Sequence, residues 1–150
     1  MNIIKKLIID HHNVLNIIEQ LEKRTEKDDE KTQELVQRLC EEISLHAKSE
    51  EKALYKICEK KNVKLRDIVL EGKIEHSLIN KVLDKLSSTA PGEDGKFKAT
   101  LYVLKELLEH HALCDEEEEL FPQIKKLFTE MELIEMGELF DDYKKELAEQ

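Results

Sequence analysis

The histidines constrain the fold of this chain more than any other feature of its sequence. All six fall at four positions along the chain: His11/His12, His46, His76 and His110/His111. Each position lies in a different segment whose apolar residues recur at i+3 and i+4, the spacing of one helix face. Three segments that break helices lie midway between successive positions: residues 27–30, 60–62 and 90–95. Because residues equidistant from a turn share a height in an antiparallel bundle, four imidazoles are predicted to share one layer.

The predicted fold class is all-α: an antiparallel up-down four-helix bundle with an additional C-terminal helix, in one domain over residues 1–150. Only 4 Gly and 2 Pro accompany 40% hydrophobic and 39% charged residues, a balance that favours long amphipathic helices. The first helix is predicted at about residues 2–25 and the third at about residues 65–86. The second is predicted to start after Asp28/Asp29, the fourth near Lys96, and the last at a capping box formed by Thr129 and Glu132. Pro122 is expected to kink or end the fourth helix at Phe121, with residues 124–128 as a short continuation. The last helix carries no histidine and is expected to pack outside the bundle.

Charge and cysteine content exclude several classes of protein. A net charge of -10 argues against a nucleic-acid or anionic-membrane partner, because both would repel this surface. The odd number of cysteines and the lack of a Cys-x-x-Cys spacing argue against a disulfide framework or a thiolate zinc site. The apolar run at residues 3–9 is too short for a signal peptide or a membrane span. We therefore expect a cytoplasmic protein with reduced thiols.

Two histidine–carboxylate pairs stand on the apolar stripes. His46 and Glu50 are i,i+4 neighbours on a stripe that continues through Leu54 and Ile57, so both point toward one spot. The second pair is irregular. Extending the stripe forward from His111 gives Asp115, whereas extending it backward from residues 120–127 gives Glu116 or Glu117. A π-bulge accommodates such a one-residue slip. His111 is therefore paired with Glu116, and Asp115 remains the alternative in an unbroken helix.

Burying these carboxylates requires a cation. An ionised carboxylate without a partner costs several kcal/mol in an apolar interior, and no Lys or Arg falls at these levels on the stripes. Neutral imidazole with carboxylate suits iron, zinc, manganese or copper rather than calcium or magnesium. Two carboxylates able to bridge, inside a four-helix bundle, favour two ions over one.

The same segments resemble the signature blocks of the hemerythrin-like, or HHE cation-binding, family. The four blocks occur in order over nearly the whole chain: Asp10-His11, His46-x-x-x-Glu50-Glu51, Glu75-His76 and His111-x-x-x-x-Glu116-Glu117. The resemblance implies a centre of two iron ions, bridged by an oxo or hydroxo group. It assigns bridging roles to Glu50 and Glu116, and it places His11 and His46 on one iron and His76 and His111 on the other.

Several neighbours of these residues are set aside. His12 and His110 are expected to be surface groups or to lie behind the ligands, although a small helix rotation would exchange them for His11 and His111. Glu51 and Glu75 are expected to be surface groups or to orient an imidazole. Two tyrosines, Tyr55 and Tyr102, are candidates for the border of the site.

Gly72 marks a departure from oxygen-carrying hemerythrins, which place a fifth histidine at this position. Four histidines and two carboxylates resemble instead the sites of iron–sulfur repair proteins and of iron- or oxygen-responsive domains. The expected function is to bind or react with a small oxidant, namely dioxygen, nitric oxide or peroxide, for sensing, storage or stress protection. The alternative is a partner-dependent enzyme that reduces peroxide or nitric oxide or repairs iron–sulfur clusters. The oligomeric state and the choice between binding and catalysis stay open.

Overall fold

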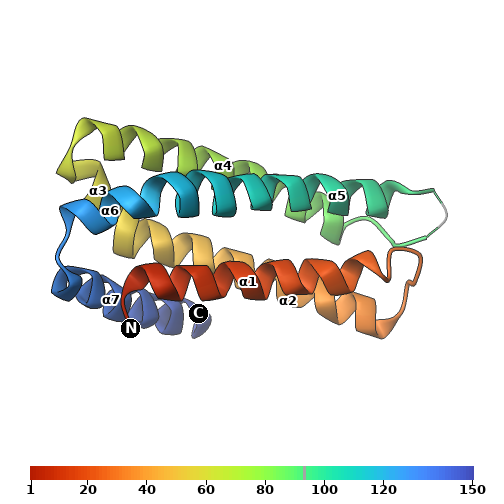
Figure 1. The fold of residues 1–150 in the computed structure, drawn as a ribbon. Coiled ribbons are helices and arrows are strands. Elements are labelled where there is room, and N and C mark those ends of the chain that lie inside the picture. Colours follow the sequence, from red (N-terminus) through yellow and green to blue (C-terminus); the bar gives the residue numbers. More distant parts are fainter. Residues whose placement is uncertain (93) are drawn as a thin grey trace.

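The computed structural model describes residues 1–92 and 94–150 of the chain, and all regular structure within them is helical (Figure 1). With η marking a π-helix, the elements are α1 (Ile3–Glu22), α2 (Glu30–Glu50), η1 (Glu51–Tyr55), α3 (Lys56–Lys61), α4 (Val63–Ser87), α5 (Lys96–Glu109), η2 (His110–Leu120), α6 (Phe121–Leu127) and α7 (Glu130–Ala148). The turn predicted at residues 90–95 includes Glu93, which lies outside the described residues. Among the described helices, none combines the length and the apolar character that crossing a bilayer requires.

Four antiparallel columns form the bundle. They are α1, the run of α2, η1 and α3, then α4, and the run of α5, η2 and α6. The turns that follow α1 and α4 lie together at one end, and the N-terminus lies at the other end with the turns after α3 and α6 (Figure 1). α1 contacts α2 and α5, and α4 contacts the same two helices from the opposite side. The predicted up-down four-helix bundle is therefore confirmed.

Polar side chains fix where the helices begin. In each of four caps a side-chain oxygen accepts a hydrogen bond from a backbone N–H three residues later: Asn2 from Lys5 at 3.0 Å, Asp29 from Thr32 at 2.9 Å, Asn62 from Leu65 at 2.8 Å and Thr129 from Glu132 at 3.1 Å. Such caps satisfy backbone donors that the first turn of a helix leaves free. The predicted starts at Asp29 and Thr129 are confirmed, and the reciprocal Glu132 contact completes the capping box.

The predicted register slip in the fourth column is present as η2, which spans the segment from His111 to Glu116. Pro122 was expected to kink or end this column, and the structure shows that it does not end it. Pro122 lies in the first turn of α6, which continues directly from η2 to Leu127. The column stays helical across this point, and the N–H of Phe121, the residue before Pro122, still bonds to the carbonyl of Glu116.

A second π-helix, η1, follows Glu50 directly and was not predicted. The stripe through Leu54 and Ile57 assumed an unbroken α-helix. Instead Cys58 is fully buried and Ile57 is only partly buried, which is the one-residue offset that a π-turn introduces. Both carboxylate-bearing columns therefore change their helical winding next to the carboxylate.

Two apolar cores fill the bundle, one on each side of the histidines. The Tyr55 core lies toward the N-terminus and includes Leu7, Leu54, Tyr55, Val69 and Leu120. The Ile79 core lies toward the α1–α2 turn and includes Val14, Ile43, Ile79 and Leu108. In every column the buried histidine falls between a member of one core and a member of the other. The interior is thus apolar, then polar, then apolar along the bundle axis.

Helix α7 packs on the outside of the bundle, as predicted, against α1, α2 and η1 (Figure 1). It adds Leu133, Met136 and Phe140 to the Tyr55 core. Gly137 makes the close approach possible, because a Cβ atom there would lie 2.8 Å from the backbone oxygen of Met1. Lys6 of α1 also donates to the carbonyl of Gly137 at 3.1 Å and forms an ion pair with Asp141.

Candidate metal centre

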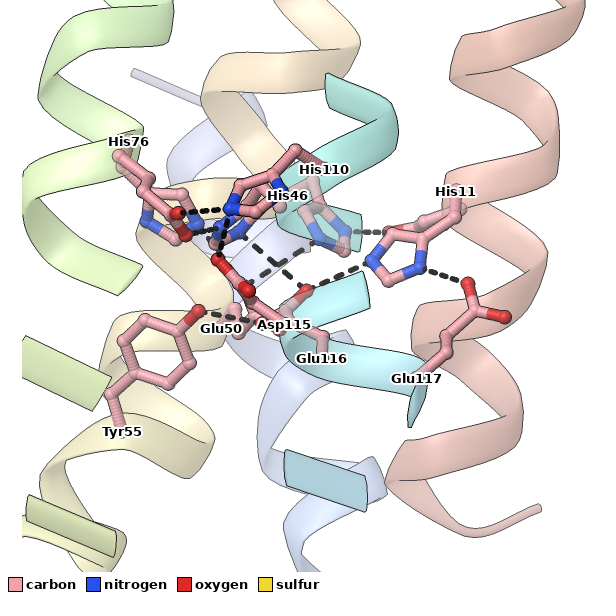
Figure 2. A network of polar contacts seen from close by, with 12 residues as sticks. His11, His46, Glu50, Tyr55, His76, His110, Asp115, Glu116 and Glu117 are labelled. Atoms are coloured by element: carbon pink, nitrogen blue, oxygen red, sulfur yellow. Dashed lines mark hydrogen bonds and ion pairs between the residues drawn. The ribbon is translucent and has the colours of Figure 1, made fainter. Parts of the chain in front are cut away.

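Six buried side chains converge where the two cores meet, and they are the six predicted from the sequence: His11, His46, Glu50, His76, His111 and Glu116 (Figure 2). Each column supplies one imidazole. The carboxylates come from the last residue of α2 and from the middle of η2. Glu50 is 0% exposed and Glu116 is 2% exposed, so the bulk solvent does not hydrate either carboxylate. We call these six residues the buried cluster.

A carboxylate holds the Nδ1 atom of every imidazole in the buried cluster. The four contacts are Glu117 with His11 at 2.7 Å, Asp10 with His46 at 2.8 Å, Glu51 with His76 at 2.7 Å and Glu75 with His111 at 2.6 Å. With the proton on Nδ1 donated to the carboxylate, Nε2 keeps its lone pair and faces the centre of the cluster. Of the two roles expected for Glu51 and Glu75, surface group or orienting group, the structure shows that both residues orient an imidazole. The roles of Asp10 and Glu117 were not predicted.

These contacts close a ring around the bundle. Each carboxylate is the sequence neighbour of a residue in the buried cluster, and each reaches the imidazole of the next column: Asp10 of α1 to α2, Glu51 of η1 to α4, Glu75 of α4 to η2, and Glu117 of η2 back to α1. We call Asp10, Glu51, Glu75 and Glu117 the outer carboxylates. A shift of one column along the bundle axis would break two of the four contacts.

The atoms that face inward have no hydrogen-bond partner within residues 1–92 and 94–150. They are Nε2 of all four histidines, both carboxylate oxygens of Glu50 and Oε1 of Glu116. Neighbouring nitrogen and oxygen atoms approach to 3.0 Å (His11 and Glu116), 3.3 Å (His76 and Glu50), 3.6 Å (His111 and Glu116) and 3.7 Å (His46 and Glu50). Two ligands about 2.1 Å from one ion lie roughly 3.0–3.4 Å apart at the usual angles. The 3.0 and 3.3 Å contacts lie in this range and the 3.6 and 3.7 Å contacts lie just beyond it, so the spacing is compatible with atoms that share metal ions.

The candidate ligands fall into two groups that share Glu50. One consists of His11, His46, Glu50 and Glu116, and the other of Glu50, His76 and His111. Within each group the ligand atoms lie within 4.8 Å of one another. A residue common to both groups is placed as a bridge between two ions would be. The donor set, imidazole nitrogen with carboxylate oxygen, suits a transition metal.

The two carboxylates of the buried cluster are electrostatically coupled. Burial and then the charge of Glu116 raise the pKa of Glu50 well above its usual value. Although burial opposes the change, the charge of His111 and the contacts with Glu50 and His11 hold the pKa of Glu116 well below its usual value. Two carboxylates in one buried site compete in this way for a single charge. A multivalent cation between them would stabilise both in the ionised form.

Tyr55 fills the space that Gly72 leaves open. Its hydroxyl donates to Oε2 of Glu116 at 2.6 Å, and its ring stacks on His76 with 5.4 Å between centroids (Figure 2). A Cβ atom at Gly72 would lie 2.6 Å from the Tyr55 hydroxyl oxygen. The place where an oxygen carrier has its fifth histidine is therefore occupied by a phenol. Tyr102, the other residue expected at the border of the site, is 61% exposed and therefore lies on the surface.

The alternatives left by the sequence lie outside the buried cluster. His12 is exposed, and the side chain of His110 is 65% exposed and lies 3.2 Å from Asp115. Asp115 is only partly buried. The π-helix explains the choice, because it turns Glu116 inward on the column that also turns His111 inward.

Comparison with known proteins agrees with this geometry. The model of the hemerythrin HHE cation-binding domain matches residues 2–124. That range covers the four columns as far as α6 and ends before α7. No curated protein and no solved structure matches the chain.

The first prediction concerns the two histidines at the start of the site. We expect His11→Ala to lose metal that the wild type retains through gel filtration, because an inward nitrogen disappears. His12→Ala is the matched control, since the same change one residue along removes only an exposed ring and should leave the metal content unchanged. Elemental mass spectrometry measures the metal content per chain of both variants and tests the prediction. Equal contents in both variants would contradict the assignment of His11.

The second prediction tests the contact between Tyr55 and Gly72. Gly72→Ala should lower the free energy of unfolding by about 1–3 kcal/mol, because the new Cβ atom overlaps the phenol. In a Tyr55→Leu background the same change should become stabilising by about 0.5–1 kcal/mol, the usual advantage of Ala over Gly in a helix. Urea unfolding of the four proteins measures both values. A cost that is the same in both backgrounds would show that Tyr55 does not limit the space.

Proposed function

The chain belongs to the hemerythrin family of HHE cation-binding domains, and on that premise we propose that it is a di-iron protein that binds or reacts with a small oxidant. The oxidant classes are dioxygen, nitric oxide and peroxide, and the roles are sensing, storage or stress protection. One observation carries the proposal: seven buried nitrogen and oxygen atoms face one another without any partner from the protein.

The residues of the buried cluster would bind two ions. His11 and His46 belong with one ion, His76 and His111 with the other, and Glu50 with both. Glu116 approaches the nitrogens of both sides, at 3.0 Å from His11 and 3.6 Å from His111, and so suits a second bridge. When bound, the iron ions supply the redox chemistry and the open coordination positions that these side chains lack. The outer carboxylates keep each imidazole in the tautomer that binds metal.

A small apolar cavity supports a small uncharged ligand. Its volume is about 30 Å³, and it lies against all four imidazoles on the side of the Ile79 core. Apolar side chains form most of the remaining wall: Val14, Leu15, Ile43, Ile79, Leu108 and Ala112. Beyond the imidazoles and Asp10, the side chains that line the cavity offer none of the two to four polar partners that a water molecule needs. Dioxygen and nitric oxide fit both the volume and the apolar wall.

The Tyr55–Gly72 pair favours reaction as a second candidate. The phenol occupies the space of a fifth histidine, so one ion has fewer protein ligands than in an oxygen carrier. Its hydroxyl also holds a proton 2.6 Å from Glu116. These features suit a partner-dependent enzyme that reduces nitric oxide or peroxide, or that repairs iron–sulfur clusters, with electrons from another protein.

The third prediction tests iron and separates the two candidates. Protein produced in iron-replete medium should contain about two irons per chain and absorb in the near ultraviolet by charge transfer. Stopped-flow mixing of the reduced protein with dioxygen or nitric oxide should give a reversible spectral change for sensing or storage. Rapid irreversible oxidation would favour the enzymatic candidate. Stoichiometric zinc without iron would overturn the di-iron proposal.

A further inference from the structure

The four outer carboxylates differ in one respect. Asp10 lies 2.5 Å from the ammonium group of Lys144, whereas the described residues give Glu51, Glu75 and Glu117 no contact with a lysine or arginine. Asp10 is also more deeply buried, with 11% of its side chain exposed against 20–35% for the other three. Three imidazoles are therefore held by carboxylates that contact no lysine or arginine of the described residues, although Glu75 also lies 3.7 Å from His110. His46 is held by a carboxylate that shares its charge with the ammonium group of Lys144.

Lys144 comes from α7, the helix beyond the range that the family model matches. Phe140, one turn earlier on α7, packs edge-on against His46 with 6.0 Å between ring centroids. The ammonium group of Lys144 lies 5.0 Å from the centre of the Phe140 ring. Helix α7 thus places an aromatic ring and a cation together over the pair of His46 and Asp10. The ring limits the access of water, which strengthens the ion pair behind it.

Two successive contacts connect Lys144 with the centre of the site. Lys144 contacts Oδ2 of Asp10, and the same oxygen accepts from Nδ1 of His46 at 2.8 Å. A hydrogen-bonded carboxylate makes an imidazole a stronger electron donor to its metal. A cation on that carboxylate draws charge away and reduces the effect.

We propose that Lys144 is a positioning residue that makes the two metal positions unequal, by weakening electron donation from His46 relative to the other three imidazoles. The inference rests on the proposed pair of metal ions. It gives α7 a role beyond packing: the helix sets the metal affinity of the position served by His11 and His46. At the position served by His76 and His111, the described part of the chain brings no lysine or arginine to the outer carboxylates.

A purely structural role for Lys144 is separable from this one. Lys6 also fastens α7, through Asp141 and the carbonyl of Gly137, and the structure shows it in no contact with an outer carboxylate. Lys6→Met is therefore the matched control for Lys144→Met, because each removes one lysine that fastens α7 to the bundle. Lys144→Arg keeps the cation, and Lys144→Gln is a second neutral variant. Far-ultraviolet circular dichroism verifies that each variant is folded.

The fourth prediction uses cobalt-loaded protein titrated with a chelator of known affinity, which reports on the two positions whether or not iron is the natural metal. Lys144→Met and Lys144→Gln should bind one of the two cobalt ions roughly threefold to tenfold more tightly, because His46 donates more strongly and a nearby positive charge is gone. The other ion should be unaffected. Lys6→Met and Lys144→Arg should match the wild type.

The outcomes separate this inference from the proposed function. Two unchanged affinities in Lys144→Met, or the same change in Lys6→Met, would overturn the role of Lys144 and leave the di-iron proposal standing. Weaker binding of cobalt in Lys144→Met at the position served by His11 and His46 would overturn the role of Lys144 as well. If the wild type holds one cobalt ion, the two-metal proposal fails. A tighter single ion in Lys144→Met alone would still support the effect of Lys144 on His46.

Discussion

A polar layer lies between two apolar cores, and its inward-facing atoms have no hydrogen-bond partner among the described residues. Two buried carboxylates and four imidazole nitrogens face one another there. An uncompensated charge at this depth costs several kcal/mol, so the layer destabilises the bundle unless a cation binds. The apolar cores stabilise the fold above and below the layer, and a bound metal ion would contribute directly to its stability. We therefore expect folding and metal loading to be linked in this chain.

The ring of outer carboxylates explains why both π-helices lie where they do. In an unbroken α-helix His111 and Asp115 would share a face, and Glu116 would point away from the cluster. The winding of η2 turns Glu116 inward and lets Glu117 reach His11 on the neighbouring column. Likewise η1 begins at Glu51, the residue that holds His76. The π-turns thus allow consecutive acids to serve two different partners, one in the cluster and one across the bundle.

The sequence predicted what depends on spacing along the chain and missed what depends on contacts between columns. The four levels of histidine, the turns between them and the slip at η2 all follow from residue intervals, and the structure agrees. The stripe at η1 was wrong because a helix of buried apolar residues offers two registers that spacing alone does not separate. The contacts of Asp10, Glu117 and Lys144 depend on how neighbouring helices are rotated, which no interval records. The pairing of Tyr55 with Gly72 joins residues on different columns, and a small residue opposite a large one is its only trace in the sequence.

The two faces of the polar layer are suited to different tasks. Toward the Ile79 core the imidazoles border the small cavity, whose remaining side chains are mostly apolar. Toward the Tyr55 core lie the carboxylates, and the phenol of Tyr55 donates to Glu116. A ligand would approach from the apolar face, while the only hydroxyl in contact with Glu116 within the described residues stands on the opposite face. The cavity and the Glu116 hydrogen bond thus lie on different sides of the cluster, so a neutral ligand that entered the cavity would leave that hydrogen bond intact.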